Sequence, residues 1–264
     1  MQLMHPAQLA RLAQIAAAAS PKPKGFFGEF LDGPILRKVL PGLIREGAKN
    51  TLMFTFFAFA GGLVVGLFLA LARGSKRRWL RWPAAVVVDF FRGLPLTLVI
   101  VFIGFGLPIA YGNLRGSFLR WPFGKFGATF VPGVIALSLV AGAYISETIR
   151  AGIEGVPRGQ MEAARSLGMP FGIAMRKVVL PQAFRLNLGP LTNELALLFK
   201  DTSQLAVLGV VLGGKEITKF ARDAANTTSN TTPLVAAGIV YLVITIPLLQ
   251  MAAWLERRVK AGSR

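Results

Sequence analysis

The chain has no cysteine and a single histidine among its 264 residues. The lack of cysteine excludes disulfides and thiolate metal sites, and it leaves the redox compartment undetermined. The one histidine, His5, lies near one end of the chain and leaves almost no material for histidine-based metal ligation or catalysis. We therefore expect no catalytic residue, no metal site and no cofactor bound by this chain.

Acidic residues are scarce as well: 12 stand against 30 basic residues, for a formal net charge of +18. A charge of this size is typical of proteins that bind nucleic acid or an anionic surface. Half of the basic residues, however, lie in three short segments, at 73–81, 150–185 and 257–264, with no aromatic-interleaved basic face. Because cytoplasmic loops of membrane proteins collect Lys and Arg, we expect membrane lipid as a partner and no nucleic acid.

Apolar residues are abundant, at 53% of the chain, and the mean hydropathy is +0.56. They form long runs separated by short basic loops, as expected when each run crosses a hydrocarbon core of roughly 30 Å with about 20 residues. Residues 1–20 lack the long apolar core of a signal peptide. We expect an all-α integral membrane protein with five spans, at about 50–72, 83–110, 128–149, 181–212 and 233–255.

The loops between these runs set the orientation. The 73–81 loop, the 150–177 segment and the C-terminal tail are the most basic, which places them in the cytoplasm, whereas the 111–127 and 213–232 loops carry less positive charge. The N-terminus is then outside and the C-terminus inside. For the first span the charge difference between its two ends is small, because four basic residues precede it; they are Arg37, Lys38, Arg45 and Lys49. The later loops therefore decide the orientation.

The predicted domain organisation is simple. Residues 1–33 form an N-terminal extension that we expect to be mobile, residues 34–258 form the transmembrane domain, and residues 259–264 form a cytoplasmic tail. Within the domain, residues 34–48 show apolar positions at helical spacing and predict an interfacial helix. Gly62 and Gly66, one turn apart, permit close helix approach, most simply within the subunit.

The 155–177 segment contains a short polar helix between two long apolar runs. Pro157 ends the preceding helix, and residues 160–167 are mostly strong helix formers. Gly168 is a suitable stop, with Pro170 just beyond it. The alanines at 163 and 164 leave a low surface against which a groove of another protein can close. An ordinary polar connector would have a similar composition.

The spacing within this segment is more specific than its composition. Glu162-Ala163-Ala164, then Gly168, then Val178 and Leu180-Pro181 resembles the coupling-loop signature of bacterial ABC importer permeases, with valine at 178 where isoleucine is usual. Three further motifs, in the same order along the chain, resemble the polar amino-acid branch of that family; they lie at 91–95, 144–160 and 193–203. Together the matches run from about residue 40 to 258.

The resemblance implies a type I ABC importer permease with a five-helix core and a short cytoplasmic coupling helix. Two permease subunits, identical or homologous, would form the pore in the bacterial cytoplasmic (inner) membrane. Two ABC ATPase subunits would bind ATP and Mg, and an extracellular or periplasmic binding protein would deliver an amino acid. The residues that would couple to the ATPase are Gly159, Gln160, Glu162, Ala163, Ala164, Leu167, Gly168, Leu180 and Pro181.

Several charged residues fall within the predicted spans, where a charge costs on the order of 2.5–3.5 kcal/mol. Glu147, Arg150 and Glu154 share a helix face and could pair with one another at the membrane interface; alternatively, Glu147 and Tyr144 border the substrate path. Adjacent Lys200 and Asp201 cannot share one face, so the helix is expected to bend or open there. The polar groups of the fourth span would otherwise pair with one another at the subunit interface, and Arg92, near the cytoplasmic end, would otherwise serve for anchoring or gating. The candidate path or substrate contacts are Arg92, Pro95, Tyr144, Glu147, Asn193, Glu194, Lys200, Asp201, Thr202 and Ser203.

The function we expect is an ATP-driven importer subunit for polar or charged amino acids, with glutamate- or glutamine-like substrates favoured. A proton- or ion-coupled secondary transporter and a membrane-anchored scaffold without transport are the alternatives. Gly209 through Glu216 nearly spells a P-loop, but Glu216 stands where a Ser or Thr would bind magnesium. We therefore do not expect this chain to hydrolyse ATP itself.

Overall fold

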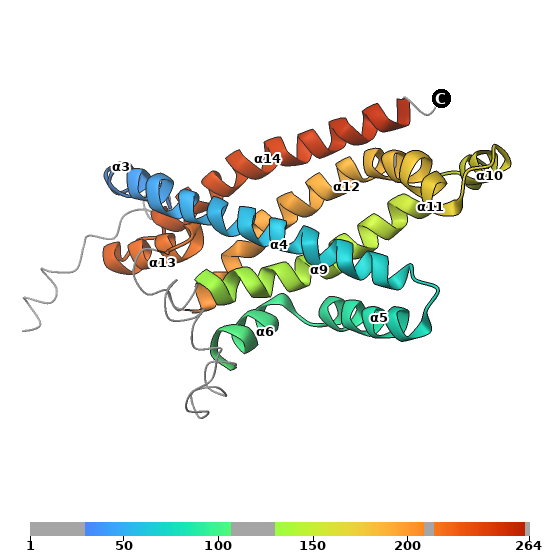
Figure 1. Ribbon diagram of the computed structural model, residues 1–264. Helices are drawn as coiled ribbons and strands as arrows, with labels where there is room; N and C mark the ends of the chain where they lie inside the picture. Colours follow the sequence, from blue (N-terminus) through green and yellow to red (C-terminus); the bar gives the residue numbers. More distant parts are fainter. Residues whose placement is uncertain (1–29, 107–129, 209–213, 262–264) are drawn as a thin grey trace, which may run out of the picture.

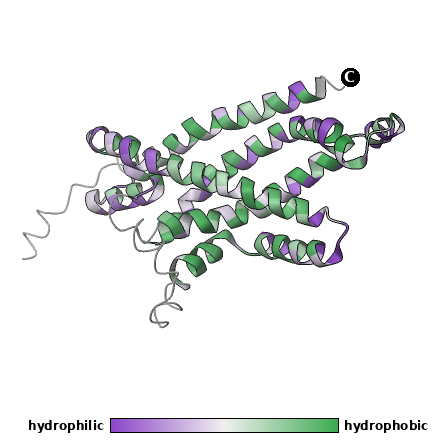
Figure 2. Ribbon diagram, viewed as in Figure 1, coloured by the Kyte–Doolittle hydropathy of each residue, from purple (hydrophilic) through white to green (hydrophobic). Residues whose placement is uncertain are grey.

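The computed structural model describes residues 30–106, 130–208 and 214–261, and every regular element within these ranges is helical (Figure 1). The expected mobility of the N-terminal extension concerns mainly residues 1–29, which lie outside the described ranges, as do the predicted 111–127 loop and the end of the tail. Apolar residues predominate along the middle of the long helices, and hydrophilic residues gather toward their two ends (Figure 2).

The first long segment runs without interruption from Gly33 to Arg73, over 41 residues. It consists of α3 (Gly33–Gly42), a π-helical stretch η1 (Leu43–Ala48) and α4 (Lys49–Arg73). Asp32 caps its start by accepting a hydrogen bond from the Ile35 N–H at 3.3 Å. The helix predicted at 34–48 is therefore present, but it continues directly into the first span.

The second predicted span is not one helix. It divides into α5 (Arg78–Gly93) and α6 (Leu96–Val101), the latter continued by the π-helical η2 (Phe102–Gly106), with a bend of 105° between them. The span predicted at about 83–110 is therefore broken by a sharp bend, and residues 107–110 lie outside the described ranges. Leu94 has an extended backbone at the bend, because a residue that precedes a proline, here Pro95, is disfavoured in helical conformation.

The third span, α9 (Phe130–Glu154), packs along α4 and shares with it the largest helix–helix interface in the described chain. Gly62 and Gly66 of α4 face α9, where a Cβ on Gly66 would lie 2.7 Å from the Cγ2 of Ile145. This close approach confirms the expectation that the two glycines serve packing within the subunit. Phe54, Leu137 and Ile145 fill the core of the interface.

The second half of the chain continues with α12 (Leu180–Asp201), which follows the 155–177 segment. At Thr202 the hydrogen bonding changes to a 3₁₀ helix, η4 (Thr202–Leu208); a bend or an opening of the helix beside Lys200 and Asp201 stays a prediction. The last predicted residues of this span, 209–212, lie outside the described ranges. Two helices complete the chain, α13 (Ile217–Thr228) and α14 (Thr232–Ala261). Residues 259–261 belong to α14 rather than to a separate tail.

Within the described ranges, three helical segments are long and apolar enough to cross a membrane, or four if the bent α5–α6 pair is counted as one span. They contain α4, α9 and α14, and α12 is not among them. The long helices α4, α9, α12 and α14 run lengthwise through the molecule (Figure 1). The α3 and α13 helices lie at one end, and α10, described below, lies at the other.

Candidate functional site

The short polar helix of the 155–177 segment is α10 (Arg158–Ser166). Its inner face rests on a small apolar cluster of Val156, Val179 and Ala183, with Met161 packed against it. Gln160 accepts a hydrogen bond from the Nε2 of Gln182 at 3.3 Å, which ties α10 to the first turn of α12. The helix is therefore seated on the bundle by both apolar and polar contacts.

The end of α10 is built as predicted from Gly168. The Gly168 N–H donates to the Arg165 carbonyl at 3.0 Å, and the Met169 N–H donates to the Ala164 carbonyl at 3.1 Å. Together with a φ of +82° at Gly168, these bonds form a Schellman motif. Because the left-handed conformation is strained for a residue with a Cβ, glycine fixes where α10 stops and where the chain turns.

Most of the predicted coupling residues lie on the open surface of this segment. Leu167 is 81% exposed and Phe171, which the sequence interpretation missed, is 52% exposed. Ala164 is a correction, because it is only 5% exposed and supports the helix rather than offering surface. The remaining predicted residues are exposed; they are Gly159, Gln160, Glu162, Ala163, Gly168, Leu180 and Pro181.

A short connection leads from α10 back to the bundle. It contains α11 (Phe171–Ala174) and the π-helical η3 (Met175–Val179), which passes directly into α12. Because η3 and α12 are continuous, this connection leads directly into the first turn of a long bundle helix.

A cavity of about 310 Å³ lies between α6, α9 and α12. Three of the predicted path residues line it together: Tyr144 from α9, and Glu194 and Asp201 from α12. The two carboxylates are seven residues apart, which places them on the same face of α12 two turns from each other. Leu94 and Leu96, on either side of the bend, also line the cavity, so the break in the second span shapes one of its walls.

The sequence interpretation missed Gln204, which lines the same cavity from η4. The Thr97 hydroxyl donates to the Gln204 side-chain oxygen, and this bond joins α6 to η4. Gln204 directly follows the motif at 193–203, so extending that motif by one residue would have included it. Its role nevertheless depends on α6, whose position the sequence did not predict.

Other predicted path residues do not line the cavity. Lys200 is exposed and is not among the lining residues, although its neighbour Asp201 is. Thr202 is fully buried, and its hydroxyl donates to the Phe199 carbonyl at 2.7 Å. The residues that line the cavity include no Lys or Arg in the described part of the chain. Asn193, Ser203 and Pro95 also lie outside the lining.

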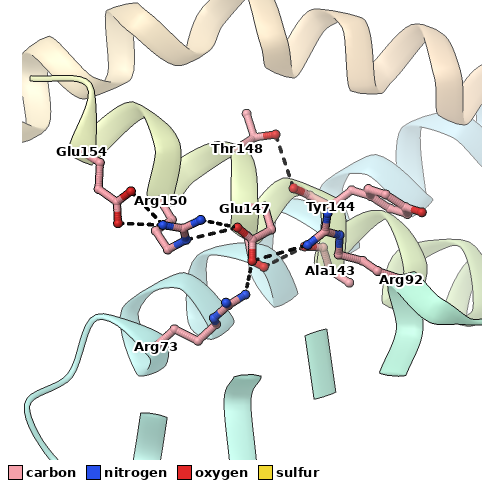
Figure 3. Close-up of polar contacts among 9 residues, drawn as sticks. Arg73, Arg92, Ala143, Tyr144, Glu147, Thr148, Arg150 and Glu154 are labelled. Atoms are coloured by element: carbon pink, nitrogen blue, oxygen red, sulfur yellow. Dashed lines mark hydrogen bonds and ion pairs between the residues drawn. The ribbon is translucent and has the colours of Figure 1, made fainter. Parts of the chain in front are cut away.

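A cluster of ion pairs joins α4, α5 and α9 (Figure 3). Glu147 of α9 pairs with Arg73 at the end of α4, with Arg150 at 2.7 Å and with Arg92 of α5 at 3.6 Å. Arg150 also pairs with Glu154 at 2.7 Å. The predicted chain of pairs along α9 is therefore confirmed, and two arginines from neighbouring helices extend it.

Tyr144 lies between this cluster and the cavity. The Arg92 guanidinium lies over the Tyr144 ring, 5.6 Å from its centroid, and the same residue lines the cavity. Arg92 is thus held by Glu147 and Tyr144 rather than placed in the cavity as a donor to a substrate. No local pattern indicated Arg73, because its partner Glu147 lies 74 residues away in the sequence.

At the opposite end of the bundle, Glu216 begins α13. Its fully buried carboxylate accepts hydrogen bonds from the N–H groups of Thr218 at 2.6 Å and Lys219 at 2.5 Å, and from the Tyr241 hydroxyl at 3.1 Å. Burial raises the pKa of Glu216 to about 6. The residue that ends the P-loop-like stretch is therefore a helix cap.

Comparison with known proteins defines the class. Residues 62–261 match the family described as the inner membrane component of binding-protein-dependent transport systems. The chain is 36% identical over 83% of its length to the arginine transport system permease protein ArtQ of Bacillus subtilis, of which it covers 93%. It is 33% identical over 83% of its length to the glutamine transport system permease protein GlnP of Escherichia coli, again covering 93%.

A solved structure agrees with these relatives. A chain in the crystal structure of an amino acid ABC transporter with histidines matches 86% of this chain, and 99% of its own length, at 32% identity and a TM-score of 0.73. The chain therefore belongs to the family of binding-protein-dependent transport system inner membrane components. It is an all-helical, multi-pass permease of the inner membrane and a transport component. Nothing in these matches supports an ion-coupled secondary transporter.

Proposed function

We propose that the chain forms the pore of an ATP-driven importer of polar or charged amino acids and is coupled to its ATPases through α10. The observation that carries this proposal is the exposed end of α10, where Leu167 projects beside a glycine-fixed turn. An exposed apolar side chain held out on a rigid turn is suited to a groove in a partner protein. The relatives named for arginine and glutamine transport support the substrate class.

In this proposal the α10 end of the bundle is cytoplasmic and the α3 and α13 end is outside. The described chain begins at the α3 end, and α14 finishes toward the α10 end (Figure 1). An odd number of passes has this arrangement, and the number is five if the α5–α6 pair counts as one pass and α12 as another. A second permease, identical or homologous, completes the pore. Two ABC ATPases hold ATP and Mg, and a binding protein outside delivers the amino acid.

Transport would proceed by alternating access. Closure of the two ATPases on ATP would move the docked α10 segments, and η3 would pass that motion to α12 as a rigid-body displacement. Since α12 carries two of the cavity's carboxylates, its displacement would change access to the cavity. The Glu147 cluster, which joins α4, α5 and α9, would keep those helices together during this movement.

The cavity supplies the chemistry for an amino acid. Glu194 and Asp201 provide acceptors for an ammonium or guanidinium group, and Tyr144 and Gln204 provide neutral polar groups. The side chains that line it here offer no cation to an acidic substrate, since Lys200 lies outside the lining and Arg92 pairs with Glu147. The geometry therefore favours cationic or neutral polar amino acids over glutamate.

The experiment that tests this function uses the permease reconstituted in liposomes with candidate ATPase and binding proteins. We expect Leu167→Asp to reduce uptake and substrate-stimulated ATP hydrolysis together by about tenfold or more, as for a central residue of an interface. Because Leu167 is 81% exposed, the substitution leaves the fold intact. Leu167→Met keeps the apolar side chain and is expected to retain both activities.

Two results would overturn the proposal. Uptake by the wild-type permease without any ATPase would show that transport does not depend on ATP hydrolysis. Normal coupling in Leu167→Asp would show that α10 does not dock through this end. Assembly of each variant with the ATPase, measured by co-purification, separates a lost interface from a lost response.

A further inference from the structure

A second cavity, of about 410 Å³, opens between α4, α5 and α9 at the α10 end of the bundle. Each of the three helices contributes one arginine to it. The complete lining is Arg73, Arg81, Trp82, Ala85, Val86, Asp89 and Arg150. The cavity is separate from the proposed translocation cavity, with which it shares no lining residue.

The charges around this cavity favour an anion. Between residues 73 and 92 the chain has six basic residues and one acidic residue. Arg73 and Arg150 are partly neutralised by Glu147, but Arg81 makes no ion pair with any described residue. A guanidinium has five N–H donors in a planar fork that fits two oxygens of a phosphate. Arg81 therefore presents unused donors and an uncompensated charge inside the cavity.

The one acidic residue of the lining restricts where an anion can lie. Asp89 is eight residues beyond Arg81 on α5, about 12 Å along the helix axis at 1.5 Å per residue. An anion is repelled from the Asp89 end and drawn to the end where Arg73 and Arg81 lie. That end is at the boundary of the spans, since α4 finishes at Arg73 and α5 begins at Arg78.

An exposed apolar strip leads away from the same cavity. Trp82 and Val86, both in the lining, are 66% and 57% exposed, and Phe90 one turn further is 57% exposed. Their spacing of four residues places them along one side of α5. Tryptophan is enriched at the membrane–water interface, where its ring lies at headgroup level. The strip therefore runs from headgroup level into the hydrocarbon region.

We propose that this cavity binds an anionic phospholipid, with its phosphate on Arg73 and Arg81 and an acyl chain along Trp82, Val86 and Phe90. A free phosphate ion shares the headgroup chemistry but makes no use of the apolar strip. All the residues named for this site belong to one subunit. The proposal does not depend on which substrate the transporter carries. Basic pockets at the ends of membrane helices bind such headgroups in other proteins.

The test measures lipid retained by the assembled transporter in native mass spectrometry after exchange into detergent with phosphatidylglycerol or phosphatidylcholine. We expect phosphatidylglycerol to be retained in preference, and Arg81→Gln to weaken its binding about fivefold, the effect of one basic residue near an anionic surface. Arg185→Gln removes the same charge from an exposed position of α12 outside the cavity and is expected to change nothing.

Three outcomes would overturn the proposal. Equal retention of the two lipids, or an equal loss in both arginine variants, would show that the cavity has no specific part in lipid binding. Displacement of the lipid by millimolar inorganic phosphate would identify a site for the free ion. Because the chain has no cysteine, Val86→Cys gives a single thiol, and a disulfide between two permeases at this position would show that the strip contacts a second subunit instead.

Discussion

At the scale of single residues, two helix ends are each set by one residue: Gly168 ends α10 through its backbone conformation, and Glu216 begins α13 through its side chain. Gly168 followed by Pro170 predicted the helix end correctly, because few residues other than glycine adopt a φ of +82° without strain. For Glu216, the sequence indicated only that the residue does not bind magnesium as the Ser or Thr of a P-loop would, and it predicted no other role. Its capping role depends on burial and on Tyr241, 25 residues away on α14, and no local pattern records that contact.

Glu216 also gives the chain a pH-dependent stability near its α13 end. Its pKa of about 6 lies above the ordinary 4.5, so the stabilisation from its protonated form is complete below pH 4.5 and is lost as the pH rises through 6. We expect the stability of α13 to increase by about 1 kcal/mol between pH 7 and pH 5. Hydrogen exchange of the α13 amides, corrected for intrinsic rates, measures this change.

Glu216→Gln is the matched control, because it keeps an oxygen that accepts the two N–H bonds and cannot titrate. Its α13 stability should not vary over the same pH range. Asp223 does not interfere: although partial burial acts to raise its pKa, Lys215 and Lys219 hold that pKa below 3.8, so its contribution is lost only at lower pH. A wild-type α13 that loosens on acidification would contradict the assignment.

At the scale of helices, hydropathy located the apolar segments but not their direction. Pro95 marks the break at Leu94 in the sequence, but apolar residues continue on both sides of it. Apolar composition indicates that a segment contacts lipid, and it does not indicate a change in the direction of the helix. The same reasoning explains why residues 34–48 were separated from the first span, which the structure shows as continuous. Ion pairs between helices, such as Arg73 with Glu147, could not be predicted from the periodicity of either helix.

The Glu147 cluster yields a prediction at this scale. Glu147→Gln leaves arginines from α4, α5 and α9 around a neutral side chain, while Glu147 itself is 18% exposed. Partial solvent exposure of the arginines limits the cost to about 2 kcal/mol, between the values for surface and buried pairs. For a protein of this size we expect the thermal unfolding midpoint to fall by roughly 4 to 8 °C in the same detergent.

Glu154→Gln serves as the comparison. Glu154 is 64% exposed and pairs only with Arg150 among the described residues, so its loss should cost less than about 1 kcal/mol. Equal shifts for the two variants would mean that the contacts of Glu147 with α4 and α5 add nothing, and that the cluster is a surface feature of α9 alone.

At the scale of the whole molecule, the cavity lining could be predicted from the sequence only where a single helix, α12, contributes it. Glu194 and Asp201 were predicted as path residues, and helical periodicity alone places them on one face. Lys200 was grouped with them because it is adjacent in sequence, which in a helix means that it points about 100° away. The opposite wall comes from α6 and α9, and its position depends on the unpredicted bend.

Uptake kinetics test the role of this cavity. We expect Glu194→Gln to raise the KM for a cationic or neutral amino acid about tenfold, the effect of losing one hydrogen bond to a charged group. Lys200→Gln, which alters an exposed neighbour outside the lining, should stay within about twofold of wild type. The opposite order of effects would place the substrate on the other side of α12.

The pairing of α4 with α9 has a consequence for biosynthesis. The glycine face of α4 packs against α9, whose described residues run from Phe130 onward, so α4 emerges from the ribosome well before that partner exists. At about 5–20 residues per second, the synthesis of residues 74–129 takes several seconds. During that interval the newly inserted α4 lies against lipid or the insertion machinery. The interface between α4 and α9 can therefore assemble only after the third span has been made.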